Sequence, residues 1–460
     1  MKYDFDVLII GAGAAGISAA QAASSAGAKV CMIEKAEMGG ECPNWACVPS
    51  KAMLTSAKMY HMAKHHLEDF GLHADGVTFS FSRIMLRKDN IVSAITGKGK
   101  RIGKMMTGSG VKVEHGAAEF VDSHTIMVGK KKISAKSIII ATGSTNFVPP
   151  IDGIDKVGLG FREVVSLRRQ PGSVAIVGAG PVGCEFATFF AMLGTKVTLL
   201  QLDKQILNRE DLEIAAIVEK KLSDYGANIL TDTKTLGVAR QGRKKRVTYQ
   251  TGRMKRQSVL VDQVIVAAGK RASLDGIKIE KSGVKVDAKG RLKLNDKLQT
   301  NVGHIFAAGD VTGGMMFTHI AHEEGEVAGH NAVCSRPGSM RRRDLRVVPR
   351  VTFTHPEVAS VGVTQAEAAI MKMKFEVISF PVGSLARAIT DGSREGMIKL
   401  VVDKKSRKIL GAHMAGNHAG DVIHEAALAM HANLTVDDIA ATIHAFPTYS
   451  EALAAAASML

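Results

Sequence analysis

The chain has 460 residues, of which 46% are hydrophobic and 46 are glycine, and its formal net charge is +16. This length leaves room for about three domains, and the abundance of glycine suits an α/β protein rich in strand-to-helix turns. No apolar run is long enough to cross a bilayer and the start carries no secretory pattern, so we expect a cytoplasmic protein. In that compartment a disulfide is usually catalytic or redox-sensing.

The first predicted elements are a strand, a helix and a second strand within 7–35, VLIIGAGAAGISAAQAASSAGAKVCMIEK. The turn after the first strand has the pattern G-x-G-x-x-G. In this pattern Gly11 makes a tight turn, Gly13 lets the backbone approach a pyrophosphate, and Gly16 lets helix and strand pack closely. The second strand ends at Glu34, whose carboxylate can accept hydrogen bonds from a ribose diol.

The next segment, GGECPNWACVPSK at 39–51, contains two of the five cysteines, Cys42 and Cys47. Their spacing is neither that of a zinc site nor that of a thioredoxin-type pair. Pro43 suits the first turn of a helix, which would place Cys42 at a helix N-terminus and lower its thiol pKa. Helical residues five apart have Cα atoms roughly 8–9 Å apart, beyond the limit of about 7 Å for a disulfide. A bond between them therefore requires a distorted first turn, and strained disulfides are easily reduced.

The strand–turn–helix–strand pattern returns at 174–202, VAIVGAGPVGCEFATFFAMLGTKVTLLQL. Two copies in register, each in the required context, strongly indicate two dinucleotide sites. The three glycines of the second copy are Gly178, Gly180 and Gly183. Gln201 stands where the first copy has Glu34, and it commits to neither NAD nor NADP. Because no arginine follows closely to bind an extra phosphate, we expect a preference for NADH.

Three more apolar runs end beside small residues, as strands do next to a bound nucleotide: 137–144, 264–270 and TNVGHIFAAGD near 300. Asp310 follows the third run, at the carboxyl end of a strand where α/β proteins hold ligands. The nucleotide contacts expected on the first two runs are Ala141, Thr142, Gly143 and Gly269.

Positive charge gathers in two segments, 240–257 and 336–346. The first resembles a β-hairpin with charge on its exposed face and few aromatic residues to stack on bases, so we expect no nucleic-acid partner. Solvated surface is the first interpretation and an acidic protein partner is the alternative. From about 346 the chain alternates in period-2 stretches and then shows helical spacing, which predicts a separate α+β domain.

Together these motifs resemble the pyridine nucleotide–disulfide oxidoreductases, the family of dihydrolipoamide dehydrogenase, glutathione reductase and mercuric reductase. The resemblance covers essentially the whole chain, and its most specific marks are GGECPNWACVPSK, the paired glycine patterns, ATGS, TNVGHIFAAGD and THPEVASVG. It implies two Rossmann-like domains, for FAD and NAD(P), and a C-terminal dimerisation domain that makes a homodimer. The expected limits are 1–147 and 276–345 for the FAD domain, 148–275 for the NAD(P) domain and 346–460 for the dimerisation domain.

The resemblance also implies roles for individual residues. Cys47 would face the flavin and Cys42 would exchange with substrate, so that electrons pass between NADH, FAD and a Cys42–Cys47 disulfide. Lys51 would lie near the reactive flavin nitrogen with Glu185 as its ion-pair partner, and Thr318 of MMFTHIAHEEG is counted among the cofactor contacts. We interpret the other three cysteines as packing residues: Cys31, Cys184 and Cys334.

The chain departs from the family pattern at its substrate side. Disulfide-reducing members have a catalytic histidine before Pro-Thr and a glutamate shortly after, whereas this chain has Phe446 at the histidine position and keeps Glu451. His444 lies two residues earlier, and on an extended segment it would share a face with Phe446, so it remains a candidate replacement. The segment AAGKRASL stands where the family usually has Gly-Arg-x-Pro-Asn, and no cysteine pair like that of mercuric reductase occurs in EALAAAASML.

From these residues, lipoamide-type chemistry is the first expectation, with a small or carrier-bound thiol or disulfide substrate. The basic surface would then suit an acidic lipoyl-type carrier. A mercuric-reductase-like enzyme acting on metal ions, quinones or another acceptor is the alternative. A nicotinamide-binding flavoprotein with a signalling role is the alternative from a different class. No resident metal and no membrane partner are expected.

Overall fold

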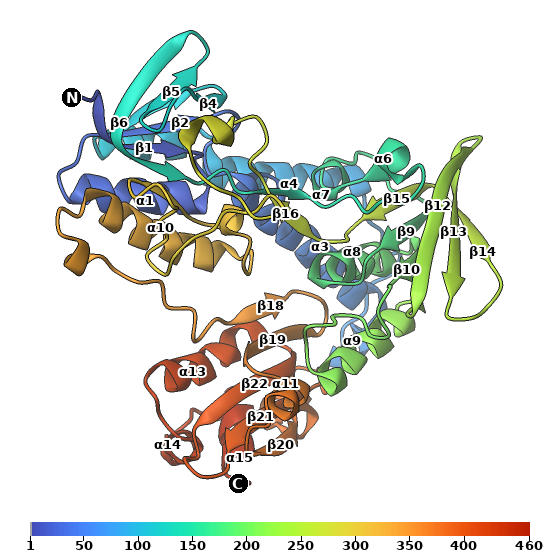
Figure 1. The fold of residues 1–460 in the computed structure, drawn as a ribbon. Coiled ribbons are helices and arrows are strands. Elements are labelled where there is room, and N and C mark those ends of the chain that lie inside the picture. Colours follow the sequence, from blue (N-terminus) through green and yellow to red (C-terminus); the bar gives the residue numbers. More distant parts are fainter. Residues whose placement is uncertain (1) are drawn as a thin grey trace. The chain divides into compact units, whose positions relative to one another are not determined.

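The computed structural model describes residues 2–460 (Figure 1). The chain divides into two compact units, each made of three separate segments. The first unit comprises the chain up to Pro49, Leu86–Phe147 and Gly269–Leu345, and the second comprises Ser50–Met85, Val148–Ala268 and Arg346–Leu460. Among residues 2–460, no helix is both long enough and apolar enough to span a membrane.

A largely parallel sheet forms the centre of the first unit. Its order is β3 (Lys112–His115), β2 (Val30–Glu34), β1 (Phe5–Ile10), β6 (Lys131–Ile140), β5 (Thr125–Val128) and β4 (Ala118–Phe120), and β17 (Ile305–Ala307) also pairs with β6. β5 and β4 are antiparallel to their neighbours. The middle strands are runs of buried Ile, Val and Leu, because hydrophobic clusters cover both faces of the sheet.

Helices α1 (Ala14–Ser25) and α10 (Thr318–Val333) lie side by side in the first unit (Figure 1). Their backbones approach so closely that a Cβ atom added at Gly325 would lie 2.3 Å from the carbonyl oxygen of Ala15. Glycine is therefore required there. The other elements with residues in this unit are α2 (Glu41–Trp45), α5 (Lys100–Gly108), β7 (Ser144–Asn146), β16 (Lys270–Ala272), η2 (Ile279–Ser282), η3 (Asp310–Thr312), η4 (Pro337–Ser339) and the starts or ends of α3 (Cys47–His65) and α4 (Phe81–Thr96).

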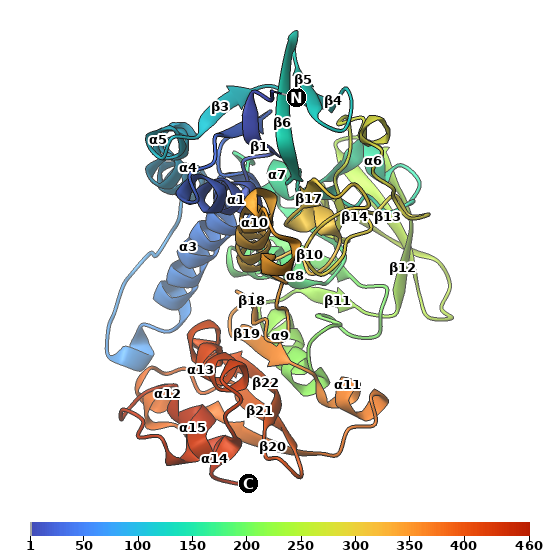
Figure 2. The ribbon, with the colours of Figure 1, turned by 60° about the vertical axis from the view of Figure 1, so that its left-hand side comes forward.

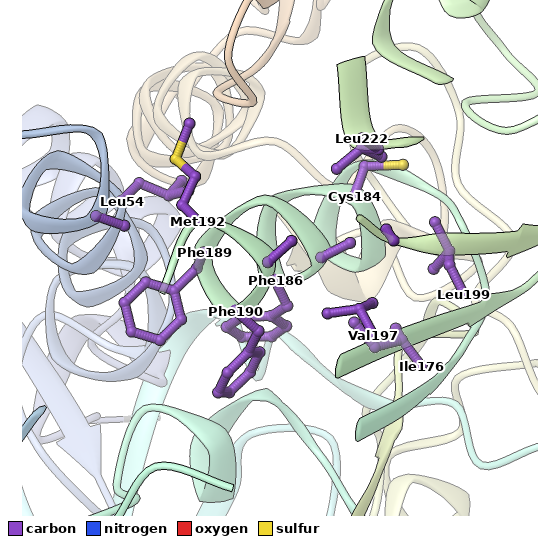
Figure 3. Close-up of a cluster of buried hydrophobic side chains, with 14 of the residues drawn as sticks. Leu54, Ile176, Cys184, Phe186, Phe189, Phe190, Met192, Val197, Leu199 and Leu222 are labelled. Carbon is purple, nitrogen blue, oxygen red and sulfur yellow. The ribbon is translucent and has the colours of Figure 1, made fainter. Parts of the chain in front are cut away.

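The second unit contains a parallel sheet of the order β11 (Asn228–Leu230), β10 (Lys196–Leu200), β9 (Ser173–Val177), β15 (Gln263–Val266) and β8 (Gly158–Leu159). Its helices are α6 (Ile154–Val157), α7 (Phe161–Val164), α8 (Pro181–Met192) and α9 (Leu212–Asp224), with η1 (Glu68–Phe70) beyond α3. Figure 3 shows Phe186, Phe189 and Phe190 of α8 in the core of this unit, together with Leu54 of α3. Thus α3 contributes its apolar face to the nucleotide-binding part of the second unit.

The two predicted repeats have the same strand register. Val7 of β1 lies opposite Val30 of β2, and Val174 of β9 lies opposite Val197 of β10. Both copies therefore place their glycine-rich turn at the same edge of a parallel sheet.

The basic segment near 240 forms an antiparallel sheet of β12 (Thr233–Gln241), β13 (Lys244–Thr251) and β14 (Gln257–Val261), as the hairpin prediction requires. Val247 and Tyr249 on one face are buried against the nucleotide-binding part. Lys244 and Arg246 alternate with them and are exposed, so the charge lies on the solvent face.

The C-terminal part of the second unit is a five-stranded antiparallel sheet with helices (Figure 2). Its order is β18 (Arg350–Thr352), β19 (Glu357–Gly362), β22 (Ile409–Gly416), β21 (Met397–Asp403) and β20 (Phe375–Pro381). The helices are α11 (Gln365–Ile370), η5 (Val382–Ser384), α12 (Ala386–Thr390), α13 (Ala419–His431), α14 (Val436–Ala441) and α15 (Glu451–Ala457). The predicted α/β class with an α+β C-terminal part is confirmed.

Candidate active site

The cysteine segment of the first unit contains a helix break that the sequence analysis did not place correctly. We expected one helix beginning near Cys42 with a distorted first turn, but the structure has two helices, α2 and α3. They meet at Ala46, whose φ of −122° and ψ of −91° are not helical. The break brings Cys42 and Cys47 onto different helices, which removes the distance limit of a continuous helix. Cys47, rather than Cys42, begins the long helix and meets the positive end of its dipole.

Several polar groups lie at the cysteine segment within the first unit. The Sγ atom of Cys47 lies 3.8 Å from the Oγ1 atom of Thr318, at the start of α10. Asp310 begins η3, and its Oδ2 atom accepts a hydrogen bond of 2.5 Å from the hydroxyl of Ser144. Lys270 of β16 forms an ion pair with Glu41, the residue before Cys42, and its Nζ atom lies 3.9 Å from Asp310. A cation and two carboxylates therefore accompany the thiols.

The Gly309–Asp310 turn is fixed by an ion pair between a buried glutamate and a partly exposed arginine, which the sequence did not predict. Glu324 of α10 accepts the amide hydrogen of Gly309 at 2.8 Å and is paired with the guanidinium of Arg343, also at 2.8 Å. Burial raises the pKa of Glu324, although the Gly309 amide and Arg343 act against that rise. The pair holds Asp310 at the carboxyl end of β17.

Lys51 and Glu185 lie together in the second unit. The Nζ atom of Lys51 is 2.9 Å and 2.8 Å from the two carboxylate oxygens of Glu185. Glu185 also accepts the amide hydrogen of Phe353 at 3.0 Å, and the Lys51 ammonium lies 4.6 Å from the centre of the Phe353 ring. The side chain of Glu185 is 7% exposed, so the carboxylate is well fixed and orients the lysine.

The two glycine-rich turns have the geometry of nucleotide sites. Gly11 and Gly178 have φ of 107° and 102°, and a Cβ atom on Gly16 or Gly183 would lie 2.0 Å or 1.9 Å from the carbonyl oxygen of Gly11 or Gly178. Within the described chain, the first turn of neither α1 nor α8 carries an acidic residue or a side-chain cap. Their free backbone N–H groups suit a diphosphate anion.

Glu34 and Gln201 have the same contact in the two copies. Glu34 accepts the amide hydrogens of Ala12 and Ala36, both at 2.7 Å, while Gln201 accepts that of Ala179 at 2.9 Å and donates to Asp203 at 3.0 Å. Each carboxylate oxygen of Glu34 keeps a second lone pair for a ribose hydroxyl.

The C-terminal residues separate into two local contacts in the second unit. His444 lies 2.7 Å from Glu425 through Nε2 and 2.9 Å from the carbonyl oxygen of Thr442 through Nδ1. Burial lowers the pKa of His444, but the hydrogen bonds to Glu425 and Thr442 outweigh it and raise the pKa overall. Glu451 instead accepts the amide hydrogen of Thr448 at 2.8 Å, and Phe446 is 77% exposed.

Two comparisons decide the family. The family model described as pyridine nucleotide-disulphide oxidoreductase matches residues 5–325, and that of its dimerisation domain matches residues 348–457. The chain belongs to the pyridine nucleotide–disulfide oxidoreductase family. The resemblance stated from the sequence is therefore confirmed, and the dimerisation domain supports a homodimer.

Relatives that are named for different activities are equally similar to this family member. It is 34% identical to a mercuric reductase of Staphylococcus aureus, over 99% of this chain and 82% of the relative. It is also 34% identical to a dihydrolipoyl dehydrogenase of Geobacillus stearothermophilus, over 97% of this chain and 94% of the relative. A solved Cu(II) complex of the HOCl-induced flavoprotein disulfide reductase RclA from Escherichia coli matches with a TM-score of 0.88 and 27% identity, covering 100% of both chains. The chain is thus a flavoprotein disulfide oxidoreductase whose specific substrate the comparisons leave open.

The family binds FAD and a pyridine nucleotide, and the residues present fit both. A side chain at Gly11 or Gly178 would meet the backbone oxygen of Ala141 at 2.2 Å or of Ala267 at 2.5 Å, so both turns are built for glycine. At the strand ends predicted to contact nucleotides, Thr142 donates to the carbonyl oxygen of Ser273 at 2.5 Å. Gly143 and Gly269 have φ of 72° and 113°.

The remaining cysteines and possible metal ligands lie outside this site. Cys31 and Cys184 are fully buried; burial raises the pKa of Cys31 to about 12 and also raises that of Cys184. Cys334 is half-buried at the end of α10 and donates to the carbonyl oxygen of Arg336. In the part of the chain that the structure describes, no three His, Cys, Asp or Glu residues are arranged to hold a metal ion.

Proposed function

We propose that this enzyme uses NADH to reduce an acceptor through a Cys42–Cys47 relay that opens and closes. In this proposal the enzyme works in the reductive direction, on an acceptor that needs no proton from the position of Phe446. The observation that supports it is the combination of Phe446 at the place of the family's catalytic histidine with a His444 whose two ring nitrogens are already bonded. A cytoplasmic location belongs to the same proposal, because such a disulfide must be reducible.

His444 is poorly suited to replace the missing acid–base group. Its contact with the Thr442 carbonyl requires a proton on Nδ1, and its contact with the Glu425 carboxylate favours a proton on Nε2. The raised pKa favours the same doubly protonated ring. An imidazolium with both protons in use cannot accept one from a substrate thiol. This favours reduction of a metal ion, quinone or other acceptor over oxidation of dihydrolipoamide.

The chain's own residues divide the work in the proposed reaction. The glycine-rich turns bind the two dinucleotides, and Lys51 held by Glu185 supplies positive charge. The Cys42–Cys47 disulfide takes up two electrons, its S–S bond breaks, and Cys47 at the start of α3 becomes a thiolate. The chemistry that a bound flavin supplies is the transfer of an electron pair between a nicotinamide and this disulfide. A soft metal ion such as Hg²⁺ suits the acceptor role. The ion takes two electrons from the dithiolate and is reduced to elemental mercury, while the two thiolates join to form the disulfide. No proton is transferred at the acceptor.

A dihydrolipoyl substrate is the second candidate, and the exposed basic sheet β12–β13–β14 favours it. From 233 to 261 the sequence contains nine Lys or Arg residues and no Asp or Glu. Such a face attracts an acidic carrier protein and is weakened by salt. This candidate predicts a steep fall of dihydrolipoyl turnover with added salt when the lipoyl group is attached to a carrier protein. Turnover of free dihydrolipoamide should depend little on salt.

The test compares wild type with Phe446→His. We expect NADH-dependent reduction of Hg²⁺ to be unchanged in the variant, because that step needs no general base. Oxidation of dihydrolipoamide by NAD⁺ should rise by about 10²-fold, since acid–base catalysis is typically worth 10²–10⁴-fold. Rapid dihydrolipoamide oxidation by the wild type, lost in His444→Ala, would contradict the proposal.

A further inference from the structure

The ion pair between Glu41 and Lys270 lies directly at the cysteine segment. Glu41 opens α2 and is followed in the chain by Cys42. Lys270 comes from β16, which pairs antiparallel with β7 so that Lys270 lies opposite Asn146. Both partners are about three-quarters buried, with side chains 27% and 24% exposed. The pair connects α2, the helix that contains Cys42, to β16, a strand far away in the sequence but in the same compact unit.

Several negative groups act on the Lys270 ammonium. Burial lowers the pKa of Lys270, but Glu41, Asp310 and Cys47 outweigh it and raise the pKa overall. The neighbouring cation on β16, Arg271, is turned to Asp275 instead, at 2.7 Å. Lys51 of α3 is already compensated by Glu185 in the second unit. Lys270 is thus a cation of the first unit that lies at the cysteine segment.

A carboxylate beside a thiol disfavours the thiolate, because the two negative charges repel each other. Glu41 is the chain neighbour of Cys42, so its negative charge disfavours the thiolate of the reduced pair unless that charge is compensated. A lysine that forms an ion pair with Glu41 compensates this charge and favours the thiolate. The need is greater here than in relatives with a histidine base, because Phe446 cannot take the thiol proton.

We propose that Lys270 is a positioning residue that, through Glu41, keeps the reduced Cys42–Cys47 pair as thiolate at neutral pH. In members with the catalytic histidine, that histidine takes the proton of the thiol. Here the positive charge of Lys270 stabilises the thiolate instead, and the thiol proton goes to solvent. The inference rests on the proposed relay. It also gives a role to the AAGKRASL segment, in which Lys270 stands at the arginine position of the usual Gly-Arg-x-Pro-Asn pattern.

Two measurements on the reduced FAD-loaded protein test this inference. One is the rate at which iodoacetamide alkylates the peptide carrying Cys42 and Cys47, followed by mass spectrometry against pH. The other is the pH midpoint of the long-wavelength thiolate-to-flavin absorbance. In Lys270→Met we expect the midpoint to rise by about one pH unit and alkylation at pH 7 to slow by about tenfold, since one unit of pKa is tenfold in thiolate.

Matched variants distinguish an electrostatic effect of Lys270 on the thiols from a purely structural role of the Glu41–Lys270 ion pair. Lys270→Arg keeps the positive charge and should have the wild-type midpoint. Glu41→Gln alone should lower the midpoint. The double variant Glu41→Gln with Lys270→Met should have a midpoint nearer to wild type than Lys270→Met has. The neighbouring control, Arg271→Met, should change nothing. If Lys270→Met fails to fold, a midpoint in Glu41→Gln that does not fall still overturns the inference.

The failure of the inference can be told apart from failure of the relay. A wild type without thiolate absorbance or dithiol alkylation after reduction overturns the proposed function, and the inference with it. A wild type that shows both, with midpoints unchanged in Lys270→Met, overturns the inference alone.

Discussion

At the residue scale, the contacts of His444 determine how its protonation contributes to the stability of the fold. Its ring is 9% exposed and bonds Glu425, whose side chain is 31% exposed. Because these bonds raise the pKa of His444, the folded protein binds its proton more tightly than the unfolded chain does. The pair therefore stabilises the fold below the ordinary histidine pKa of about 6.5, and this contribution disappears as the pH rises through the raised folded pKa.

We expect Glu425→Gln to lower the free energy of unfolding by about 1 kcal/mol at pH 5.5 and by much less at pH 9. Urea unfolding at the two pH values measures it. Glu376→Gln, which removes an exposed carboxylate 4.0 Å from Lys404, serves as the control and should have little effect at either pH. If Glu425→Gln lowers the free energy of unfolding equally at both pH values, His444 is not protonated in this pair.

At the scale of elements, the two glycine-rich turns should act independently. A methyl group at Gly16 or Gly183 would overlap a backbone oxygen of its own turn, so the strand–turn–helix unit must shift. Gly16→Ala should lower the FAD content of the purified protein at least tenfold. Gly183→Ala should leave FAD bound but weaken NADH binding by a similar factor.

Flavin absorbance and NADH titration measure these two effects. Gly108→Ala is the matched control, because a Cβ atom there meets nothing within 4 Å. A Gly183→Ala protein that loses its flavin and keeps its affinity for NADH would contradict the assignment of the turns.

The repeated elements could be predicted from the sequence because their signals are local. A glycine pattern between a buried strand and an alanine-rich helix determines the turn, and Glu34 and Gln201 close both copies with the same hydrogen bond. A distorted turn between the cysteines was expected, but its position at Ala46 was not, because alanine favours helix and only the surrounding structure forces it out of that conformation.

The pairs Glu41–Lys270 and Glu324–Arg343 were also missed. Each joins two segments that come together only in the folded first unit, and no spacing rule connects them. The departure at AAGKRASL was the only signal, and it pointed to the segment without naming a partner. The Lys51–Glu185 pair was anticipated only through the family resemblance.

At the scale of the whole molecule, the dimerisation domain leaves apolar side chains exposed in the single chain. Ile443, Phe446 and Leu428 are 97%, 77% and 66% exposed. These exposed apolar side chains lie within one stretch of this domain, 428–446, and mark an interaction surface. A second copy is the partner that the family implies.

We expect Ile443→Asp to shift the protein from dimer towards monomer, as measured by light scattering after size exclusion. Ile370→Asp, at an 80% exposed position on α11 of the same domain, should leave the mass unchanged. A dimer of unchanged stability in Ile443→Asp would place the interface elsewhere.

The central claim, that Cys42 and Cys47 form the electron relay, is tested most directly by anaerobic titration with NADH. Wild type should take up two electrons with a long-wavelength thiolate-to-flavin band before the flavin itself is bleached. Cys47→Ser should lose this band, and Cys42→Ser should show it without added NADH because Cys47 is then a permanent thiolate. A wild type whose flavin bleaches without the band, and whose titration is unchanged in both variants, would contradict the account.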